Sequence, residues 1–93
     1  GDLGTSIFPK GTRPYLQTDD FEEHLNLMQA YHLRTMCNNA ALRKWVSQVR
    51  QYEIDLLVPQ HGALLQKHQI EPFLDWLENL YCGTDLLDNL YGF

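Results

Sequence analysis

Apolar residues recur at helical spacing in three stretches of the chain. In the first stretch the intervals are four, three and four residues, and the positions are Phe21, Leu25, Met28 and His32. Because residues three and four apart share one face of a helix, this spacing predicts an amphipathic helix. Thr18 and Asp19 suit its start, and Asp19 and Glu22 have the spacing of a capping box. We expect this helix to end near Met36.

Two more helices are expected, over residues 40–51 and 70–81. Asn38 interrupts the first pattern and can cap the second helix. Each helix has one apolar face. In the helix over residues 40–51 this face consists of Leu42, Trp45, Val46 and Val49. In the helix over residues 70–81 it consists of Ile70, Phe73, Leu74, Leu77 and Leu80. Pro72 then falls in a first helical turn, where its missing N–H is tolerated, and Gly83 is a suitable C-terminal stop.

Residues 54–58 predict a short buried strand. The run is mostly apolar and is stopped by Pro59. Residues 1–17, apart from a short extended piece at 6–8, and residues 60–69 are expected to be loop. A buried strand needs backbone partners on both edges. We therefore expect an α/β fold of which this chain is a portion, mostly helices with one or two strands. Another chain or a removed N-terminal segment would supply the other strands.

Composition and charge narrow the class of protein. A length of 93 residues allows one small domain, and 44% hydrophobic with 20% charged residues is ordinary for a globular protein. Seven Lys and Arg against twelve Asp and Glu give a net charge of −5, which argues against a nucleic-acid or an anionic membrane surface. A chain this short buries only about two-thirds of its unfolded surface. We therefore expect it to be weakly stable in isolation.

The two cysteines do not form a metal-binding pair. Cys37 and Cys82 lack C-x-x-C or zinc-type spacing. We expect two reduced, half-buried thiols in a cytoplasmic protein, with a single disulfide as the alternative.

Two loop residues are candidates for metal chemistry. Asp2 has glycines on both sides, at Gly1 and Gly4, so the backbone there can approach a ligand closely. His61 directly follows the predicted strand, and ligands of α/β sheets gather beyond the carboxyl ends of strands. An imidazole and a carboxylate suit iron or zinc, although a tight site needs three or four ligands. The alternative is a turn aspartate and an ordinary loop histidine.

The other three histidines are expected to be structural. His24 and His32 lie on the predicted first helix, and we expect both to be buried or at the rim of the core. His68 precedes the predicted third helix and is expected to be solvated. The sequence has no Ser-His-Asp signature, no glycine-rich phosphate loop and no zinc-finger spacing.

The segments around Asp2 and His61 resemble the last two metal-ligand motifs of the metallo-β-lactamase superfold. They read Gly-Asp-Leu-Gly at residues 1–4 and Leu-Val-Pro-Gln-His-Gly at residues 57–62. More narrowly, the chain is similar to the di-iron branch, which contains flavodiiron proteins and related oxygen-binding di-iron proteins. The further segments similar to this branch are residues 20–25, 31–34, 39–46, 73–78 and 82–83. The similarity runs along nearly the whole chain.

This resemblance implies the C-terminal portion of a metallo-β-lactamase αβ/βα sandwich. In that family the aspartate of the Gly-Asp motif bridges two metals, a role that falls to Asp2. The histidine of the Pro-x-His-Gly motif binds one metal, a role that falls to His61. The implied cofactor is iron, with two ions per complete domain, and zinc is the alternative. The implied small-molecule ligand is O2 or NO.

The resemblance also implies that part of the site lies elsewhere. The family's remaining ligands belong to an upstream H-x-E-x-D or H-x-H-x-D-H motif and to one mid-domain histidine, and this sequence contains none of them. We therefore expect residues 1–93 to be a single partial domain. Thr35 stands where relatives often carry an aromatic residue beside the metal pocket, and Tyr31 lies one helical turn earlier.

Three functions follow from these patterns. The first is half of a binuclear site in a di-iron oxygen-binding or O2/NO redox protein, with this chain alone incomplete as a catalyst. The second is the C-terminal part of a zinc-dependent hydrolase. The second ligand position of the missing upstream motif would separate the two, because Glu there favours the di-iron proteins and His favours the zinc hydrolases. The third is a non-catalytic structural fragment or subunit. The expected partner is the missing N-terminal part of the domain, and a homo-oligomer is the alternative. We expect neither nucleic acid nor a membrane to be a partner.

Overall fold

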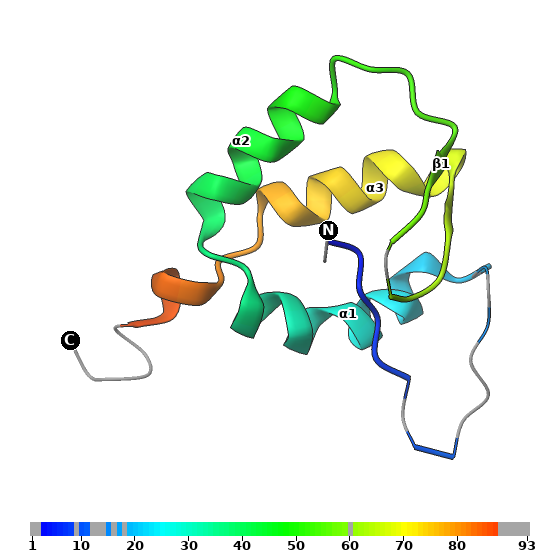
Figure 1. Cartoon of the computed structure of the whole chain (residues 1–93), viewed down its shortest axis with the longest axis horizontal. Helices are drawn as coiled ribbons and strands as arrows, with labels where there is room; N and C mark the ends of the chain where they lie inside the picture. The colour runs from blue at the N-terminus through cyan, green and yellow to red at the C-terminus, as the bar shows by residue number, and fades with distance from the viewer. Residues whose placement is uncertain are drawn as a thin grey trace.

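The computed structural model describes residues 3–8, 10–11, 15, 17, 19–59 and 61–87. In chain order the elements are α1 (Phe21–Thr35), α2 (Asn39–Val49), β1 (Leu56–Leu57), β2 (Leu65–Gln66), α3 (Lys67–Glu78) and the 3-10 helix η1 (Gly83–Leu86), as Figure 1 shows. A mostly helical chain with a two-stranded sheet is the expected portion of an α/β domain. The fold class predicted from the sequence is confirmed.

Helix α1 begins one residue after its cap. The side chain of Asp20 accepts a hydrogen bond from the N–H of Glu23 at 3.1 Å. The N-terminal cap is therefore Asp20, one residue after the position expected at Asp19. The helix ends at Thr35 because Met36 has an extended backbone.

Helices α2 and α3 are both present, but α3 is shifted toward the N-terminus. The cap predicted at Asn38 is confirmed, since its side chain accepts from the N–H of Ala41 at 2.9 Å. Helix α3 starts at Lys67, three residues before the predicted start, because Gln69 Oε1 accepts the N–H of Gln66 at 2.9 Å and closes a capping box. Pro72 consequently lies beyond the first turn.

Gly83 is not the stop of α3, which ends at Glu78. It begins η1 instead, with a φ of +54°. A Cβ atom at this position would collide with the backbone carbonyls of Met36 and Cys37. The glycine therefore allows the chain after α3 to pack closely against the turn between α1 and α2.

The strand prediction for residues 54–58 is wrong in length and in burial. Only Leu56 and Leu57 are in a strand, and they pair antiparallel with Gln66 and Leu65. Leu56 is 46% exposed and Val58 is 66% exposed. The predicted loop over residues 60–69 contains the pairing strand β2 and the start of α3. Within the described part of the chain, residues 6–8 form no strand.

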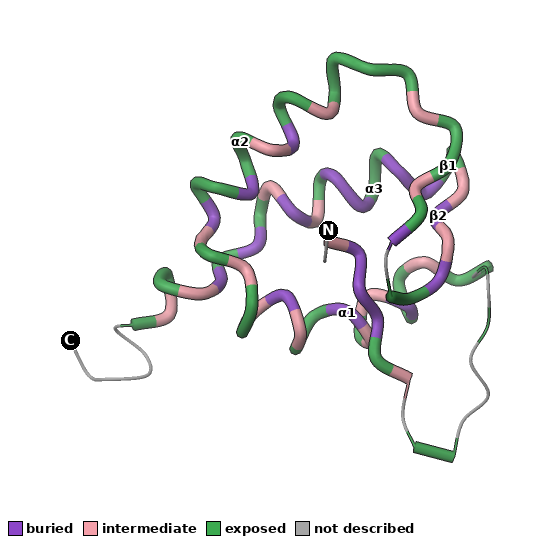
Figure 2. The backbone as a smooth tube through the Cα atoms, in the orientation of Figure 1, coloured by how far each residue is buried: buried purple, intermediate pink, exposed green. Residues whose placement is uncertain are grey.

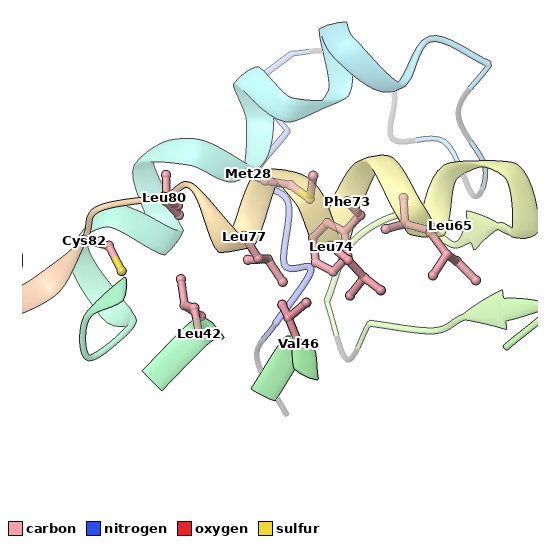
Figure 3. Close-up of a cluster of buried hydrophobic side chains, with 10 residues drawn as sticks. Met28, Leu42, Val46, Leu65, Phe73, Leu74, Leu77, Leu80 and Cys82 are labelled. Carbon is pink, nitrogen blue, oxygen red and sulfur yellow. The ribbon is translucent and has the colours of Figure 1, made fainter. Parts of the chain in front are cut away.

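The core lies between α3 and the inner faces of α1 and α2, which Figure 2 shows as buried stripes. Figure 3 shows its side chains, and the cluster consists of Met28, Leu42, Val46, Leu65, Ile70, Phe73, Leu74, Leu77, Leu80 and Cys82. Residues of the three predicted apolar faces therefore meet in one place. Burial of apolar side chains of this size is the main source of stability in such a core.

The two cysteines differ in environment. Both are free, but Cys82 is fully buried in the core and Cys37 is exposed, so neither is half-buried as expected. Burial raises the pKa of the Cys82 thiol, and the nearby carboxylate of Asp85 raises it further. Cys82 is therefore a protonated, apolar core residue at neutral pH.

Candidate metal centre

The segment after Asp2 lies between α1 and the loop that follows β1 (Figure 1). On one side the N–H of Ile7 donates to the carbonyl oxygen of Leu27 at 2.9 Å. On the other side the N–H of Ser6 donates to the carbonyl oxygen of His61 at 3.2 Å. Asp2 itself lies outside the described residues. The structure therefore brings together the loop that follows one candidate ligand and the loop that carries the other.

Two glycines permit the close contact between these loops. Gly62 has a φ of +130°, and a Cβ atom there would lie 2.5 Å from Ser6 Oγ and 3.0 Å from the carbonyl oxygen of Gly4. Gly4 has a φ of +87°, and a Cβ atom there would lie 2.9 Å from Cγ of Pro59. Each candidate motif thus presents a glycine to the other. The Ser6 hydroxyl completes the contact by accepting the buried N–H of Ala63 at 3.3 Å.

His61 is exposed in the middle of the loop that joins β1 to β2. Its side chain makes no hydrogen bond or ion pair with any described residue, whereas its carbonyl is held by Ser6. An accessible imidazole on a fixed backbone is chemically suited to ligate iron or zinc. The sequence-based choice of this residue as a candidate is consistent with its position.

His32 is fully buried, and both ring nitrogens are engaged. The N–H of Gly4 lies 3.0 Å from Nε2, and Nδ1 lies 2.7 Å from the carbonyl oxygen of Met28. A carbonyl only accepts, so Nδ1 carries the proton and Nε2 accepts from Gly4. Burial lowers the pKa of His32, and the bond to Met28 opposes that effect only in part. The sequence predicted its burial correctly but did not reveal its link to the Asp2 loop.

His24 is also fully buried, eight residues earlier on α1. Its Nδ1 lies 2.8 Å from the hydroxyl of Tyr15, and its Nε2 has no hydrogen-bond partner among the described residues. The ring of Phe8 lies edge-on to that of Tyr15, with centroids 4.8 Å apart. Burial lowers the pKa of His24. The predicted structural role of this histidine agrees with its burial and with its ring contacts to Phe8 and Tyr15.

A cavity of about 450 Å³ opens beside the candidate loops. Its lining consists of Leu3, Thr35, Met36, Cys37, Trp45, Leu57 and Val58. Thr35 is thus in the wall of this cavity. Tyr31 is not in that wall, and its ring lies edge-on to His32 with centroids 5.7 Å apart.

The candidate loops carry two side chains whose chemistry suits a metal. Among the residues that the structure describes, no group of three or more His, Cys, Asp or Glu side chains converges to hold a metal. An imidazole at His61 and a carboxylate at Asp2, which lies outside the described residues, are donors of the right chemistry. The segment that follows Asp2 is in contact with the loop that carries His61. The chemistry of these two side chains fits a metal ligand. In the described parts of the chain no helix is long and apolar enough to cross a membrane.

Comparison with solved structures identifies two close structural matches. One is described as the peroxy diiron species of chemotaxis sensor ODP, with 40% identity and a TM-score of 0.85 over 97% of this chain and 38% of that one. The other is the apo state of chemotaxis sensor ODP from T. denticola, with 39% identity and a TM-score of 0.85 over 97% and 36%. The chain thus spans less than two-fifths of the length of either match. No curated protein sequence matches it.

The sequence profile of a family described as "ODP family beta lactamase" matches residues 1–62. This range includes both candidate motifs, α1 and α2. The family whose profile matches agrees with the fold class and with the resemblance to di-iron proteins of the metallo-β-lactamase fold noted at residues 1–4 and 57–62. The chain belongs to the ODP family of beta-lactamase-like proteins.

Proposed function

We propose that this chain supplies the C-terminal half of a di-iron centre that binds O2. The observation that carries the proposal is the hydrogen bond between Ser6 and the carbonyl of His61, which joins the two motif loops. The 40% identical structure of a peroxy diiron sensor supports the choice of iron and of oxygen. Asp2 and His61 are the proposed ligands.

The two side chains have complementary roles in this proposal. The carboxylate of Asp2 has two oxygens and can bridge two cations, whereas the neutral imidazole of His61 binds one. Two iron ions bound at this position would supply a coordination site for a small diatomic ligand. The chain's contribution is to fix both donors before the metals arrive, which is what gives a site its affinity.

The remaining ligands come from a partner segment. We infer that an upstream part of the same domain, in the same or another polypeptide, provides them. We call this chain together with that segment the complete domain. A second copy of this chain would add only further Asp2 and His61 side chains, so it is the weaker partner. Nucleic acid and membrane are not among the proposed partners, since the net charge is −5. The free thiols suit the cytoplasm, which is the location we propose.

Oxygen binding is testable without knowledge of a downstream signal or electron donor. The metal-free complete domain is reconstituted with Fe2+ under anaerobic conditions and then mixed with stoichiometric O2 while its absorption spectrum and oxygen uptake are followed. We expect uptake close to one O2 per two irons, and no uptake in a His61→Ala variant. Uptake that is equal in the variant would contradict the proposal.

Redox turnover and hydrolysis are the alternatives that the same preparation separates. Sustained consumption of O2 or NO with an added reductant would place the protein among the reductases. A protein that holds zinc and consumes no O2 would belong with the hydrolases.

A further inference from the structure

We infer that His32 is a positioning residue of the metal centre, holding the loop that carries Asp2 by accepting the N–H of Gly4. The inference rests on the proposed function, because it concerns the placement of a proposed ligand. It also stands on a contact that exists without metal, the 3.0 Å bond from Gly4 N to His32 Nε2.

The imidazole is fixed at both ends. Its Nδ1–H donates to the carbonyl oxygen of Met28 at 2.7 Å, one helical turn earlier on α1, so the second nitrogen must face away from the helix. The ring lies edge-on to Trp76 at a centroid distance of 5.2 Å and to Tyr31 at 5.7 Å. A ring held by a hydrogen bond and two aromatic neighbours presents Nε2 at one position. Gly4 is the group found there.

Gly4 is close enough to Asp2 for this bond to govern the ligand. Only Leu3 separates them, so their Cα atoms are at most about 7 Å apart. Gly4 is buried, and so are Thr5 and Ser6, as Figure 2 shows for this stretch. A hydrogen bond shielded from water is costly to break, because the freed N–H has no water to replace its partner.

The loop is therefore held at two points, with different partners. Toward α1 the anchor is His32, through the N–H of Gly4. Toward the second motif the anchor is the carbonyl of His61, through the N–H of Ser6. The first anchor fixes Gly4 to α1, and the second fixes Ser6 to the loop that carries His61. Loss of either anchor would free the backbone segment that follows Asp2, the proposed carboxylate ligand.

Volume alone does not explain a histidine at this position. His32 lies in an apolar stripe and is fully buried, where a leucine would fill space without the cost of desolvating an imidazole. A leucine, however, would leave the buried amide of Gly4 unpaired. The neutral ring, with a pKa lowered by burial, supplies an acceptor that no aliphatic side chain offers.

The test uses the complete domain and three variants. His32→Leu removes the acceptor, His32→Gln keeps one at a similar reach, and His24→Leu removes the other fully buried histidine of α1, which bonds Tyr15 instead. Two quantities are measured, the hydrogen exchange of the Gly4 amide in the metal-free protein and the affinity for Fe2+ under anaerobic conditions. Residues behind metal ligands typically change affinity 10- to 100-fold when they are removed.

We expect His32→Leu to speed exchange at Gly4 and to weaken Fe2+ binding by at least about tenfold. We expect His32→Gln to restore most of the exchange protection of Gly4 and most of the Fe2+ affinity. We expect His24→Leu to leave both quantities near their wild-type values. Equal Fe2+ affinity in His32→Leu and wild type, or an equal loss in His24→Leu, would overturn the inference while leaving the proposed function standing. A wild-type domain that binds no metal would overturn both.

A second measurement serves if His32→Leu does not fold. Nitrogen-15 chemical shifts of the wild-type ring report which nitrogen is protonated. We expect the neutral form with the proton on Nδ1, as the bond to Met28 requires. A neutral ring with the proton on Nε2 cannot accept from Gly4 and would contradict the inference.

Discussion

The N–H of Ser6 donates a hydrogen bond to the carbonyl oxygen of His61 at 3.2 Å, which joins the first candidate motif to the second. The same residue accepts the N–H of Ala63 through its hydroxyl at 3.3 Å. These two bonds set the spacing between the loop that follows Asp2 and the loop that carries His61. The metal centre that we propose depends on that spacing, since neither loop offers more than one ligand.

Gly62→Ala is expected to damage the contact between the loops. A Cβ atom would lie 2.5 Å from Ser6 Oγ, and the φ of +130° is itself strained for alanine. We expect a loss of about 1–3 kcal/mol in the free energy of unfolding of the complete domain, together with weaker Fe2+ binding. Urea unfolding and metal titration measure the two effects.

Gly11→Ala is the matched control. Its φ is +89°, so alanine is strained there too, but nothing lies within 4 Å of the added atom. The difference between the two variants isolates the contact with Ser6. Equal losses of stability and unchanged Fe2+ affinity in both would argue that the loops do not touch.

Asn39→Ala is expected to destabilise the join between α2 and the end of α3. The side-chain amide of Asn39 donates to the carbonyl oxygens of Glu78 at 2.8 Å and Leu80 at 2.9 Å. Without it both acceptors lose a partner in a buried region, at a cost of about 1–3 kcal/mol. Asn26→Ala, at an exposed position on α1, should change the free energy of unfolding by less than about 0.5 kcal/mol. Similar values for the two variants would refute this role of Asn39.

Stability is expected to fall as the pH drops below about 6.5. Burial lowers the pKa of His24 and of His32 from the ordinary value of 6.5. The unfolded chain therefore takes up protons near pH 6.5 that the folded chain still rejects, so unfolding becomes easier toward lower pH. The contribution of the two neutral histidines to the free energy of unfolding is fully present above this pH, and it is lost as the pH falls toward their pKa values in the folded chain.

Urea midpoints of the metal-free complete domain between pH 7.5 and 5 test this expectation. A His24→Gln/His32→Gln double variant should show a flatter profile over that range, whereas His68→Gln, at an exposed site, should not. A double variant with the slope of the wild type would show that other groups control the pH dependence.

Asp2→Ala and His61→Ala are each expected to abolish the binuclear centre of the complete domain. Each removes one of the two ligands proposed from this chain, and a site with too few ligands loses its affinity. Elemental analysis of the purified variants measures the loss, and His68→Ala is the matched control because His68 is exposed on α3. Retention of two metals by either ligand variant would count against the assignment.

Features of the fold that depend on the local spacing of residues were predictable from the sequence. Features that depend on which residues pair with each other were not. The three helices follow from the spacing of apolar residues, and the cap at Asn38 follows from its side chain. The start of α3 was missed because it depends on the bond between Gln66 and Gln69. The strand was misjudged because Leu56 and Leu57 are defined by their partners Gln66 and Leu65, which no local pattern specifies.

The candidate site shows the same division. His61 is a candidate because of its place after the predicted strand, and its proposed role, like that of Asp2, comes from the family resemblance. The role of His32 was not found, because its sequence position predicts only burial. The function that we infer for His32 depends on the amide of Gly4, a contact 28 residues away that exists only in the folded chain.

The most direct test of the account is the metal content of the complete domain, measured by elemental analysis beside that of this chain alone. We predict two irons per complete domain and no stoichiometric iron in the chain by itself, since it contributes only Asp2 and His61. Two irons held by the isolated chain would contradict the half-site. Two zincs in the complete domain would support a hydrolase, and no metal in either preparation would contradict the metal centre altogether.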